Sequence, residues 1–173
     1  TSRGLGDVYK SQAEQGLPEA AFIIRIQQEL AQPKTCGIGY NSIRFDDEIT
    51  RFALWRSLRD PYGREWQNGN SRWDLLDVTR ALRALRPAGI EWPVRDDGFS
   101  SFRLEDLTAA NGIEHSAAHD AMADVVATIE IAKLLKRCDE HLFDTLYRQR
   151  TKRAVSALVN PVSYTHLTLP TSS

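Results

Sequence analysis

The sequence has few cysteines, no long apolar run and no surplus of charge of either sign. Cys36 and Cys138 are the only cysteines among 173 residues, too few for the disulfide framework of a small secreted domain, and this favours a reducing compartment. No apolar run approaches the roughly 20 residues of a membrane span, and no charged-then-apolar leader opens the sequence. We therefore expect a cytoplasmic protein that does not contact a membrane.

The balance of charge limits how this protein could bind a polyanion. Lys and Arg together number 22 against 23 Asp and Glu, which gives a formal net charge of −1. No global basic field can hold nucleic acid by charge alone, so any such site has to be local. A hydrophobic content of 42% is typical of one ordinary folded domain.

Both ends of the sequence are expected to be foreign to the domain. Residues 162–166 can be encoded by a DNA segment whose reverse complement, read in a shifted frame, encodes Val-Tyr-Lys-Arg. Residues 8–11, near the other end, are Val-Tyr-Lys-Ser, which differs from that translation only in the last residue. This near-inverted repeat resembles a translated sequencing adapter. We expect residues 1–12 and 162–173 to be adapter-derived, and the remainder then carries 20 basic and 22 acidic side chains.

Apolar spacing and breaker residues predict a largely helical chain. Helices are expected over residues 18–31, 74–86, 103–110, 119–137 and 142–159, and from residue 46 to the stop at Asp60-Pro61. A buried strand is expected over residues 35–41, and an exposed loop over residues 62–72. The second helix should carry an apolar stripe of Ile49, Phe52, Ala53, Trp55 and Leu58. The helix over 119–137 should bury Ala121, Val125, Ile129, Ala132 and Leu135. Few strands accompany these helices, so we expect an α/β fold whose other strands lie upstream.

Two groups of acidic residues could do chemistry. Asp46 stands where the expected strand runs into a helix, a junction from which a carboxylate could hold a hard cation, although an ordinary helix cap is the alternative. Asp120 and Asp124, four residues apart, would share a helix face as a second possible metal site. His119 precedes Asp124 by five residues and lies about 140° away around the helix. Acidic residues favoured by the helix dipole are the alternative at this second place.

Several longer segments together resemble one known family. They are residues 39–48 (GYNSIRFDDE), 70–77 (NSRWDLLD), 101–105 (SFRLE), 111–115 (NGIEH) and 119–125 (HDAMADV). In these segments, and over nearly all of residues 14–160, the chain is similar to the bacterial exodeoxyribonuclease I family. That family belongs to the DEDD exonucleases of the histidine subtype, in which four carboxylates hold two divalent metal ions and a histidine is the base.

The resemblance implies a fold and a reaction. The fold would be an incomplete ribonuclease H-like exonuclease domain over 13–137, mostly its helical C-terminal part, with a helical linker over 138–161 towards a β-barrel domain. The reaction would be the removal of nucleoside 5′-monophosphates from the 3′ end of single-stranded DNA, with Mg²⁺, in DNA repair and recombination. Asp46 and Asp124 would be metal ligands and His119 the general base, and Asp120 would not be a ligand.

One part of the family pattern is missing. The resemblance calls for an Asp-x-Glu pair on an opening strand, which supplies two of the four carboxylates. Asp46-Asp47-Glu48 has this spelling, but it belongs to the second motif at a helix start. We therefore expect this fragment to be catalytically inactive.

Residues for binding a DNA strand and a partner protein are also implied by the resemblance. Aromatic platforms and basic side chains hold single strands, with stacking worth roughly 1–3 kcal/mol per base. The matching positions are Arg51, Tyr62, Trp66, Arg80 and Arg103, whereas Trp73 and Trp92 have no such match and are expected in the core. Arg86 is a candidate contact for the acidic C-terminal tail of single-stranded-DNA-binding protein. A monomer is expected.

Two other functions remain open at this stage. A related 3′–5′ exoribonuclease would share Asp46, His119 and Asp124, and would differ in tolerating a 2′-hydroxyl near the sugar. A non-catalytic module that binds single-stranded nucleic acid would have lost its metal site, and its gene would lack Asp-x-Glu upstream as well. The segments 70–77 and 101–105 favour the DNA enzyme.

Overall fold

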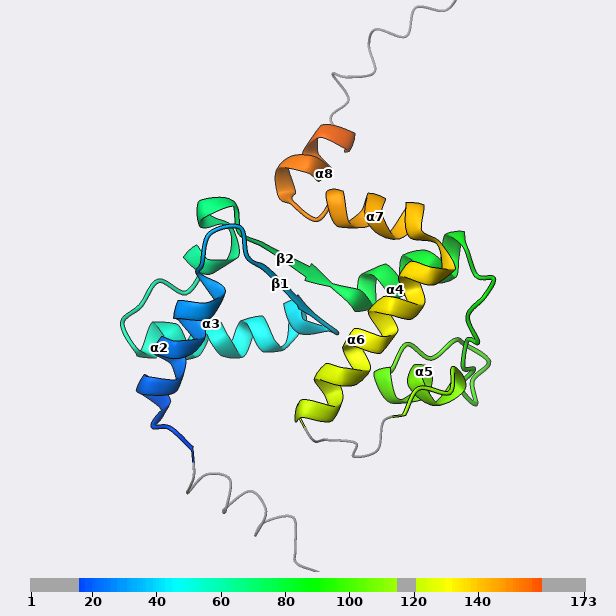
Figure 1. Cartoon of the computed structure of the whole chain (residues 1–173), viewed down its shortest axis with the longest axis horizontal. Helices are drawn as coiled ribbons and strands as arrows, with labels where there is room; N and C mark the ends of the chain where they lie inside the picture. Colours follow the sequence, from blue (N-terminus) through cyan, green and yellow to red (C-terminus); the bar gives the residue numbers. More distant parts are fainter. Residues whose placement is uncertain (1–15, 115–120, 160–173) are drawn as a thin grey trace, which may run out of the picture. The chain divides into compact units, whose positions relative to one another are not determined.

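The computed structural model describes residues 16–114 and 121–159, as helices joined to a short parallel sheet (Figure 1). The elements in chain order are α2 (Glu19–Leu30), β1 (Cys36–Gly39), η1 (Ser42–Arg44), α3 (Asp46–Arg56), η2 (Gly63–Glu65), η3 (Gln67–Gly69), β2 (Ser71–Asp74), α4 (Leu75–Leu85), α5 (Leu104–Ala110), α6 (Ala121–Cys138), α7 (Glu140–Arg148) and α8 (Lys152–Val159). They form two compact units. The first unit holds residues 44–71 and the described residues up to 37, and the second holds 38–43 and the described residues from 72 onwards.

The first unit is built on the packing of α2 against α3. Pro18 is the N-cap of α2, where its missing N–H costs no helical hydrogen bond. Ile23 from α2 is buried with Ala53 and Leu54 from α3, and Ile26 packs against this cluster one turn along α2. A small apolar core therefore fixes the axis of α3, the helix that begins with Asp46.

The helix predicted from Asp46 is confirmed as α3, and most of the apolar residues that indicated it lie at the surface. Ala53 is buried, but the other members of the stripe are more than half exposed: Ile49 55%, Phe52 62%, Trp55 68% and Leu58 96%. The spacing of apolar residues indicates that a helix has an apolar face, but it does not indicate which of those residues pack against another helix. Here α2 is contacted through Ala53 and Leu54, so the broader stripe is left open to solvent.

The sheet consists of β1 paired with β2. The strand predicted over 35–41 is confirmed as β1, although it is not buried as expected, since Ile38 is 52% exposed. The strand β2 was not predicted, because a four-residue segment, Ser-Arg-Trp-Asp, is too short to show a clear alternation. Ser71 N–H donates to the carbonyl of Thr35 at 3.0 Å, which sets the register of the pair.

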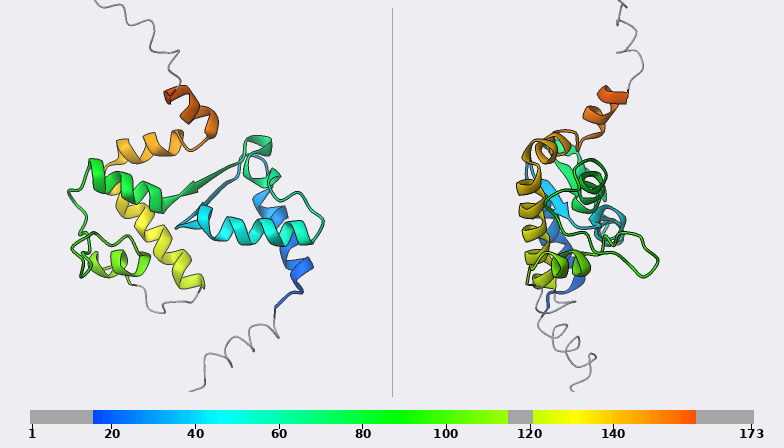
Figure 2. Two further views of the ribbon diagram at one scale, coloured as in Figure 1. Left: turned by 180° about the vertical axis from the view of Figure 1, so that it is seen from behind. Right: turned by 90° about the vertical axis from the view of Figure 1, so that its right-hand side faces the viewer.

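The second unit is a group of helices in which α6 packs against α4, α5 and α7 (Figure 2). Its most buried large apolar side chains, each at most 1% exposed, come from the three helices α4, α5 and α6: Leu75, Leu82, Leu107, Ile131 and Leu135. Trp73 is buried as predicted, with its ring 4.9 Å from that of Phe143 and 5.0 Å from that of Tyr147. The prediction for Trp92 is wrong, because this side chain is only half-buried.

The helix α6 also buries a different face from the one predicted. Leu135 is buried as expected, but the residues buried with it are Ala127 and Ile131, at a spacing of four. Val125 and Ile129, predicted in the core, are 54% and 48% exposed. The remaining two predicted positions, Ala121 and Ala132, are exposed and half-buried.

The helix predicted over 142–159 is interrupted at residues 149–151, which separate α7 from α8. Neither of these two helices has a fully buried residue, as expected for surface helices. Within the described ranges no helix has the length and apolar character that crossing a membrane requires. The segments expected to be adapter-derived, 1–12 and 162–173, lie outside the described residues.

Candidate active site

Asp46, the first predicted metal ligand, is the first residue of α3 and is exposed. The first turn is strongly acidic, with Asp47 and Glu48 following, and negative charge there is favoured by the helix dipole. The hydroxyl of Thr50 donates to the carbonyl oxygen of Asp46 at 2.7 Å, which ties down the first turn. Asp46 therefore projects from a braced helix end in the first unit.

The segment that leads into this helix is held by a carboxylate that the sequence analysis missed. Asp74, 3% exposed, accepts hydrogen bonds from the backbone N–H groups of Asn41 (2.8 Å) and Ile43 (3.2 Å). It also caps α4 by accepting from Leu76 N–H at 3.0 Å. An Asp directly before a predicted helix is a recognisable cap signal, but its second task joins segments more than 30 residues apart. One buried carboxylate thus fixes residues 41–43, just before Asp46 in the chain.

A buried network of ion pairs lies behind the start of α3. Arg64 donates to Asp47 at 2.8 Å, and the side chain of Arg64 is only 5% exposed. Glu65, 6% exposed, lies 3.7 Å from Arg64 and also binds Arg51 through both carboxylate oxygens, at 2.8 Å and 2.9 Å. Hydrogen bonding to Glu65 raises the pKa of Arg51 above its ordinary value. The sequence analysis placed Arg64 and Glu65 in an exposed loop, and the structure buries both.

The two aromatic residues predicted to stack on DNA bases flank η2, which carries Arg64 and Glu65 of this network. Tyr62 is 55% exposed and Trp66 is 66% exposed, so both prediction and structure place these rings at the surface. The guanidinium of Arg51 lies over the Tyr62 ring, 5.3 Å from its centroid. Arg51 and Tyr62 are therefore in contact in the first unit, and Trp66 directly follows Glu65 in the chain.

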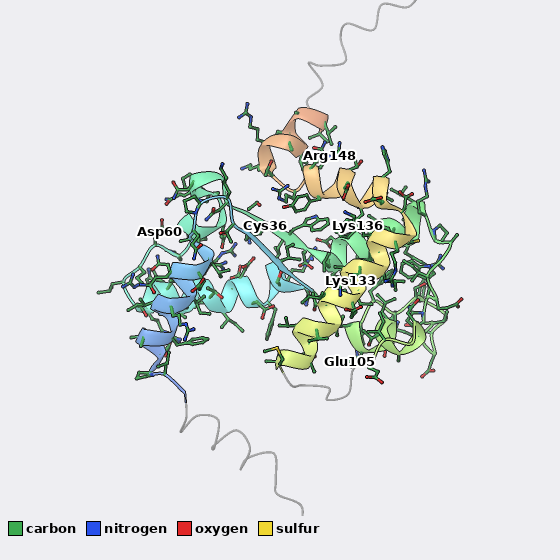
Figure 3. The ribbon with its side chains drawn as sticks, viewed as in Figure 1. Cys36, Asp60, Glu105, Lys133, Lys136 and Arg148 are labelled. Atoms are coloured by element: carbon green, nitrogen blue, oxygen red, sulfur yellow. The ribbon has the colours of Figure 1, made fainter. Side chains whose placement is uncertain are left out.

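The turn between α3 and these aromatic residues depends on Asp60 (Figure 3). One carboxylate oxygen of Asp60 accepts from the backbone N–H groups of Tyr62 and Gly63, at 2.9 Å and 3.1 Å. A Cβ atom at Gly63 would lie 2.6 Å from the other oxygen of Asp60, so a side chain here would displace the Asp60 carboxylate. The turn holds the backbone of Tyr62 rigidly beside η2.

The other two predicted DNA contacts, Arg80 and Arg103, both belong to the second unit. Arg80, on α4, lies over the ring of Phe102 at 5.9 Å, and Phe102 is the neighbour of Arg103 in the chain. Tyr40 donates its hydroxyl hydrogen to the carbonyl of Phe102 at 2.8 Å, and burial raises the pKa of Tyr40 to about 12. Both arginine side chains remain accessible, 49% and 70% exposed, and each pairs with one nearby carboxylate.

Asp124, the second predicted metal ligand, stands in the first turn of α6 and is half-buried. Its carbonyl oxygen accepts from the Thr128 hydroxyl at 2.7 Å, the same bracing that Thr50 gives to Asp46. His119, the predicted base, and Asp120 lie outside the described residues. Asp46 belongs to the first unit and Asp124 to the second. Among residues 16–114 and 121–159, no three His, Cys, Asp or Glu side chains form a group that could hold a metal ion.

Arg86, the predicted partner contact, lies at the end of α4 and is 65% exposed. Its Nε atom pairs with Asp139 at 3.2 Å, at the junction of α6 and α7. An open cavity of about 380 Å³ next to this junction is lined by Lys133, Lys136, Arg137 and Glu140. Figure 3 shows Lys133 and Lys136 on α6. Three of these four lining side chains are basic, and two of them are paired: Lys133 with Glu130, and Lys136 with Glu140 and Asp144.

Comparisons with known proteins give one consistent result. Residues 12–132 match the exonuclease family RNase_T. Exodeoxyribonuclease I of Escherichia coli (strain K12) is 59% identical over 145 residues, which are 84% of this chain and 30% of that protein. The chain thus spans less than a third of that relative.

Solved structures agree with the sequence match. The E. coli exonuclease I in complex with a dA16 oligonucleotide superposes with a TM-score of 0.79 at 58% identity, over 84% of this chain and 31% of that one. A complex of ExoI with SSB-Ct gives the same TM-score, identity and coverage. The expected fold, a ribonuclease H-like nuclease domain of the α/β class, is confirmed by these matches.

Proposed function

The chain belongs to the exonuclease family. On this premise we propose that the complete enzyme, with an Asp-x-Glu pair that this chain lacks outside residues 46–48, removes nucleotides from the 3′ end of single-stranded DNA, and that this chain supplies part of its strand-binding surface. Nucleoside 5′-monophosphates would be released, in the course of DNA repair and recombination in the cytoplasm. The observation that carries this proposal is the 59% identity to E. coli exodeoxyribonuclease I over 145 residues. The family match over residues 12–132 includes Asp46, His119 and Asp124.

Divalent-metal dependence goes with the exonuclease family, and we propose that the metal is Mg²⁺. Asp46 and Asp124 would be ligands, because carboxylate oxygens are the donors that Mg²⁺ prefers and each residue stands in a first helical turn. The donor type therefore fits, and two further carboxylates would complete the set. When bound, a pair of such ions activates water and stabilises the charge of a phosphoryl displacement.

The remaining residues would handle the proton and the strand. His119 would accept the proton of the attacking water, since an imidazole with a pKa of roughly 6.5 can do so near neutral pH. Arg51, Arg80 and Arg103 would contact phosphates. Tyr62 and Trp66 would stack on bases, and the exposure of their rings is consistent with that task.

The surface around Arg86 would bind the acidic tail of single-stranded-DNA-binding protein. Support comes from the basic side chains on α6 at the same helix junction, Lys133, Lys136 and Arg137, which would favour a peptide rich in carboxylates. A related structure, the ExoI/SSB-Ct complex, is consistent with such a partner.

Oligonucleotide binding by the 173-residue chain tests the strand-binding part of this proposal. The assay is fluorescence anisotropy of a labelled oligo(dT), with the Trp66→Ala variant compared with Trp55→Ala, since both tryptophans are about two-thirds exposed. Loss of one stacked base should weaken binding by Trp66→Ala about fivefold to a hundredfold. Trp55→Ala should bind like the parent chain.

Two controls complete the experiment. Circular dichroism should show both tryptophan variants folded like the parent chain. An RNA oligonucleotide of matched sequence should bind more weakly than DNA, and equal or tighter RNA binding would favour the exoribonuclease alternative. Equal DNA affinities of the two tryptophan variants would contradict the assignment of Trp66.

A further inference from the structure

Arg51 binds two carboxylates that differ sharply in exposure. Its Nε and one terminal nitrogen donate to the two oxygens of Glu65, a bidentate pair in which the Glu65 side chain is 6% exposed. Its other terminal nitrogen donates to Glu48 at 2.5 Å, and the Glu48 side chain is 50% exposed. One guanidinium therefore has a buried carboxylate on one edge and a solvated carboxylate on the other.

The buried edge is fixed in place. Glu65 also lies 3.7 Å from Arg64, which in turn binds Asp47, and all three are nine-tenths or more buried. A fork of two parallel N–H donors on one carboxylate determines the plane of a guanidinium as well as its position. Rotation of Arg51 away from this plane would leave Glu65 as a buried charge with one cation fewer, which is strongly disfavoured.

The other edge of Arg51 faces the half-exposed Glu48 carboxylate, while the Arg51 side chain itself is 17% exposed. Glu48 and Arg51 are three residues apart on the surface of α3, and exposed pairs of this kind contribute little free energy. A phosphate oxygen is an anionic acceptor of the same type as the Glu48 carboxylate. A strand that follows Tyr62, whose ring lies beneath the Arg51 guanidinium, would bring a phosphate to this edge.

We propose that Glu65 is a positioning residue that aims Arg51 at the DNA backbone, and that Glu48 competes with a phosphate for the same edge of Arg51. This inference rests on the proposed function, since it presumes that Arg51 contacts single-stranded DNA. The two carboxylates that bind Arg51 thus have opposite effects on DNA affinity. Glu48 lowers the affinity, because a phosphate has to displace it from Arg51, and Glu65 raises the affinity, because it orients Arg51.

Single and double variants of the 173-residue chain test the inference by anisotropy with labelled oligo(dT). Glu48→Gln should tighten binding about twofold to fivefold. Glu65→Gln should weaken it about fivefold or more, since the fork that orients Arg51 loses its charge. In an Arg51→Gln background both effects should disappear, because the side chain through which they act has gone.

The matched control for Glu48→Gln is Glu130→Gln. Glu130 forms the same kind of exposed pair with Lys133, three residues away on α6, so its removal gives the same change in net charge far from Arg51 in the sequence. Thermal unfolding separates loss of fold from loss of orientation for Glu65→Gln. The exposed Glu48→Gln variant keeps the test decisive if the buried variant does not fold.

Three results would overturn the inference. Glu48→Gln could bind no more tightly than Glu130→Gln, its gain could persist without Arg51, or a well-folded Glu65→Gln could bind as the parent chain does. Each of these leaves strand binding by the chain intact. Absence of any oligonucleotide binding by the parent chain would instead overturn the proposed function, and this inference with it.

Discussion

Asp74→Asn should destabilise the protein although it changes only one atom of the side chain. The carboxylate accepts three backbone hydrogen bonds, with one oxygen serving Asn41 and Leu76 and the other serving Ile43. Asn offers a single acceptor oxygen in place of two. Either orientation of its amide group places an NH₂ against at least one of these backbone N–H groups.

The magnitude follows from burial. Asp74 is 3% exposed, so water cannot easily replace the lost acceptor. A hydrogen bond to a charged group contributes about 1.5–3 kcal/mol, and a buried donor left without an acceptor costs about the same. We expect the free energy of unfolding to fall by about 2 kcal/mol, equivalent to about 4–8 °C in Tm for a chain of this length.

Urea denaturation followed by circular dichroism measures this loss. The matched control is Asp77→Asn, which removes the same charge from an exposed position on the same helix, where Asp77 pairs with Arg80. That control should change stability by less than about 1 kcal/mol. A fall in stability for Asp74→Asn no larger than for Asp77→Asn would refute the view that Asp74 bridges α4 and residues 41–43.

The remaining predictions concern pH, catalysis and the partner surface. Burial raises the pKa of Tyr40 to about 12 in the folded state, whereas the ordinary tyrosine pKa of about 10 applies in the unfolded state. The stabilisation is therefore complete below about pH 10. Between about pH 10 and 12 the tyrosine of the unfolded state ionises first, so the free energy of unfolding should fall by roughly 2 kcal/mol. This fall should be smaller in Tyr40→Phe, as denaturation across that range would reveal. The chain by itself should show no Mg²⁺-dependent degradation of a 5′-labelled oligonucleotide on a gel, because it has no Asp-x-Glu pair besides residues 46–48; activity abolished by Asp124→Ala would contradict this. Arg86→Glu should abolish binding of a labelled peptide from the tail of single-stranded-DNA-binding protein. The control Arg95→Glu changes a similarly exposed ion pair and should leave peptide affinity unchanged. Equal peptide affinities of the two variants would show that Arg86 does not contact the peptide.

Local signals in the sequence were sufficient for most of the helices. Pro18, the acidic run at Asp46 and the Asn111-Gly112 stop each mark a boundary that the structure reproduces within about two residues. The surface position of Tyr62 and Trp66 was also predicted, because polar and glycine residues surround them. These features depend on neighbours in the chain, which a sequence displays directly.

Contacts between distant residues could not be predicted in the same way. The burial of Arg64 and Glu65 depends on Asp47 and Arg51, which lie 14 or more residues earlier, so a segment that is polar by composition becomes the interior of an ion-pair network. The strand β2 was missed for a related reason, since a four-residue strand is specified by its partner β1 more than by its own pattern.

The sequence by itself determined the family, through segments such as residues 39–48 and 119–125 that resemble it, and it indicated where helices begin and end. The tertiary structure alone decided which faces of α3 and α6 are buried, and which acidic residues act as buried supports. The physical reason is that helix periodicity is a local property of the chain, whereas the burial of a charge depends on which distant groups compensate it. Asp74 and Glu65 look like ordinary acidic residues in the sequence, and only their contacts show that one holds the approach to Asp46 and the other holds Arg51.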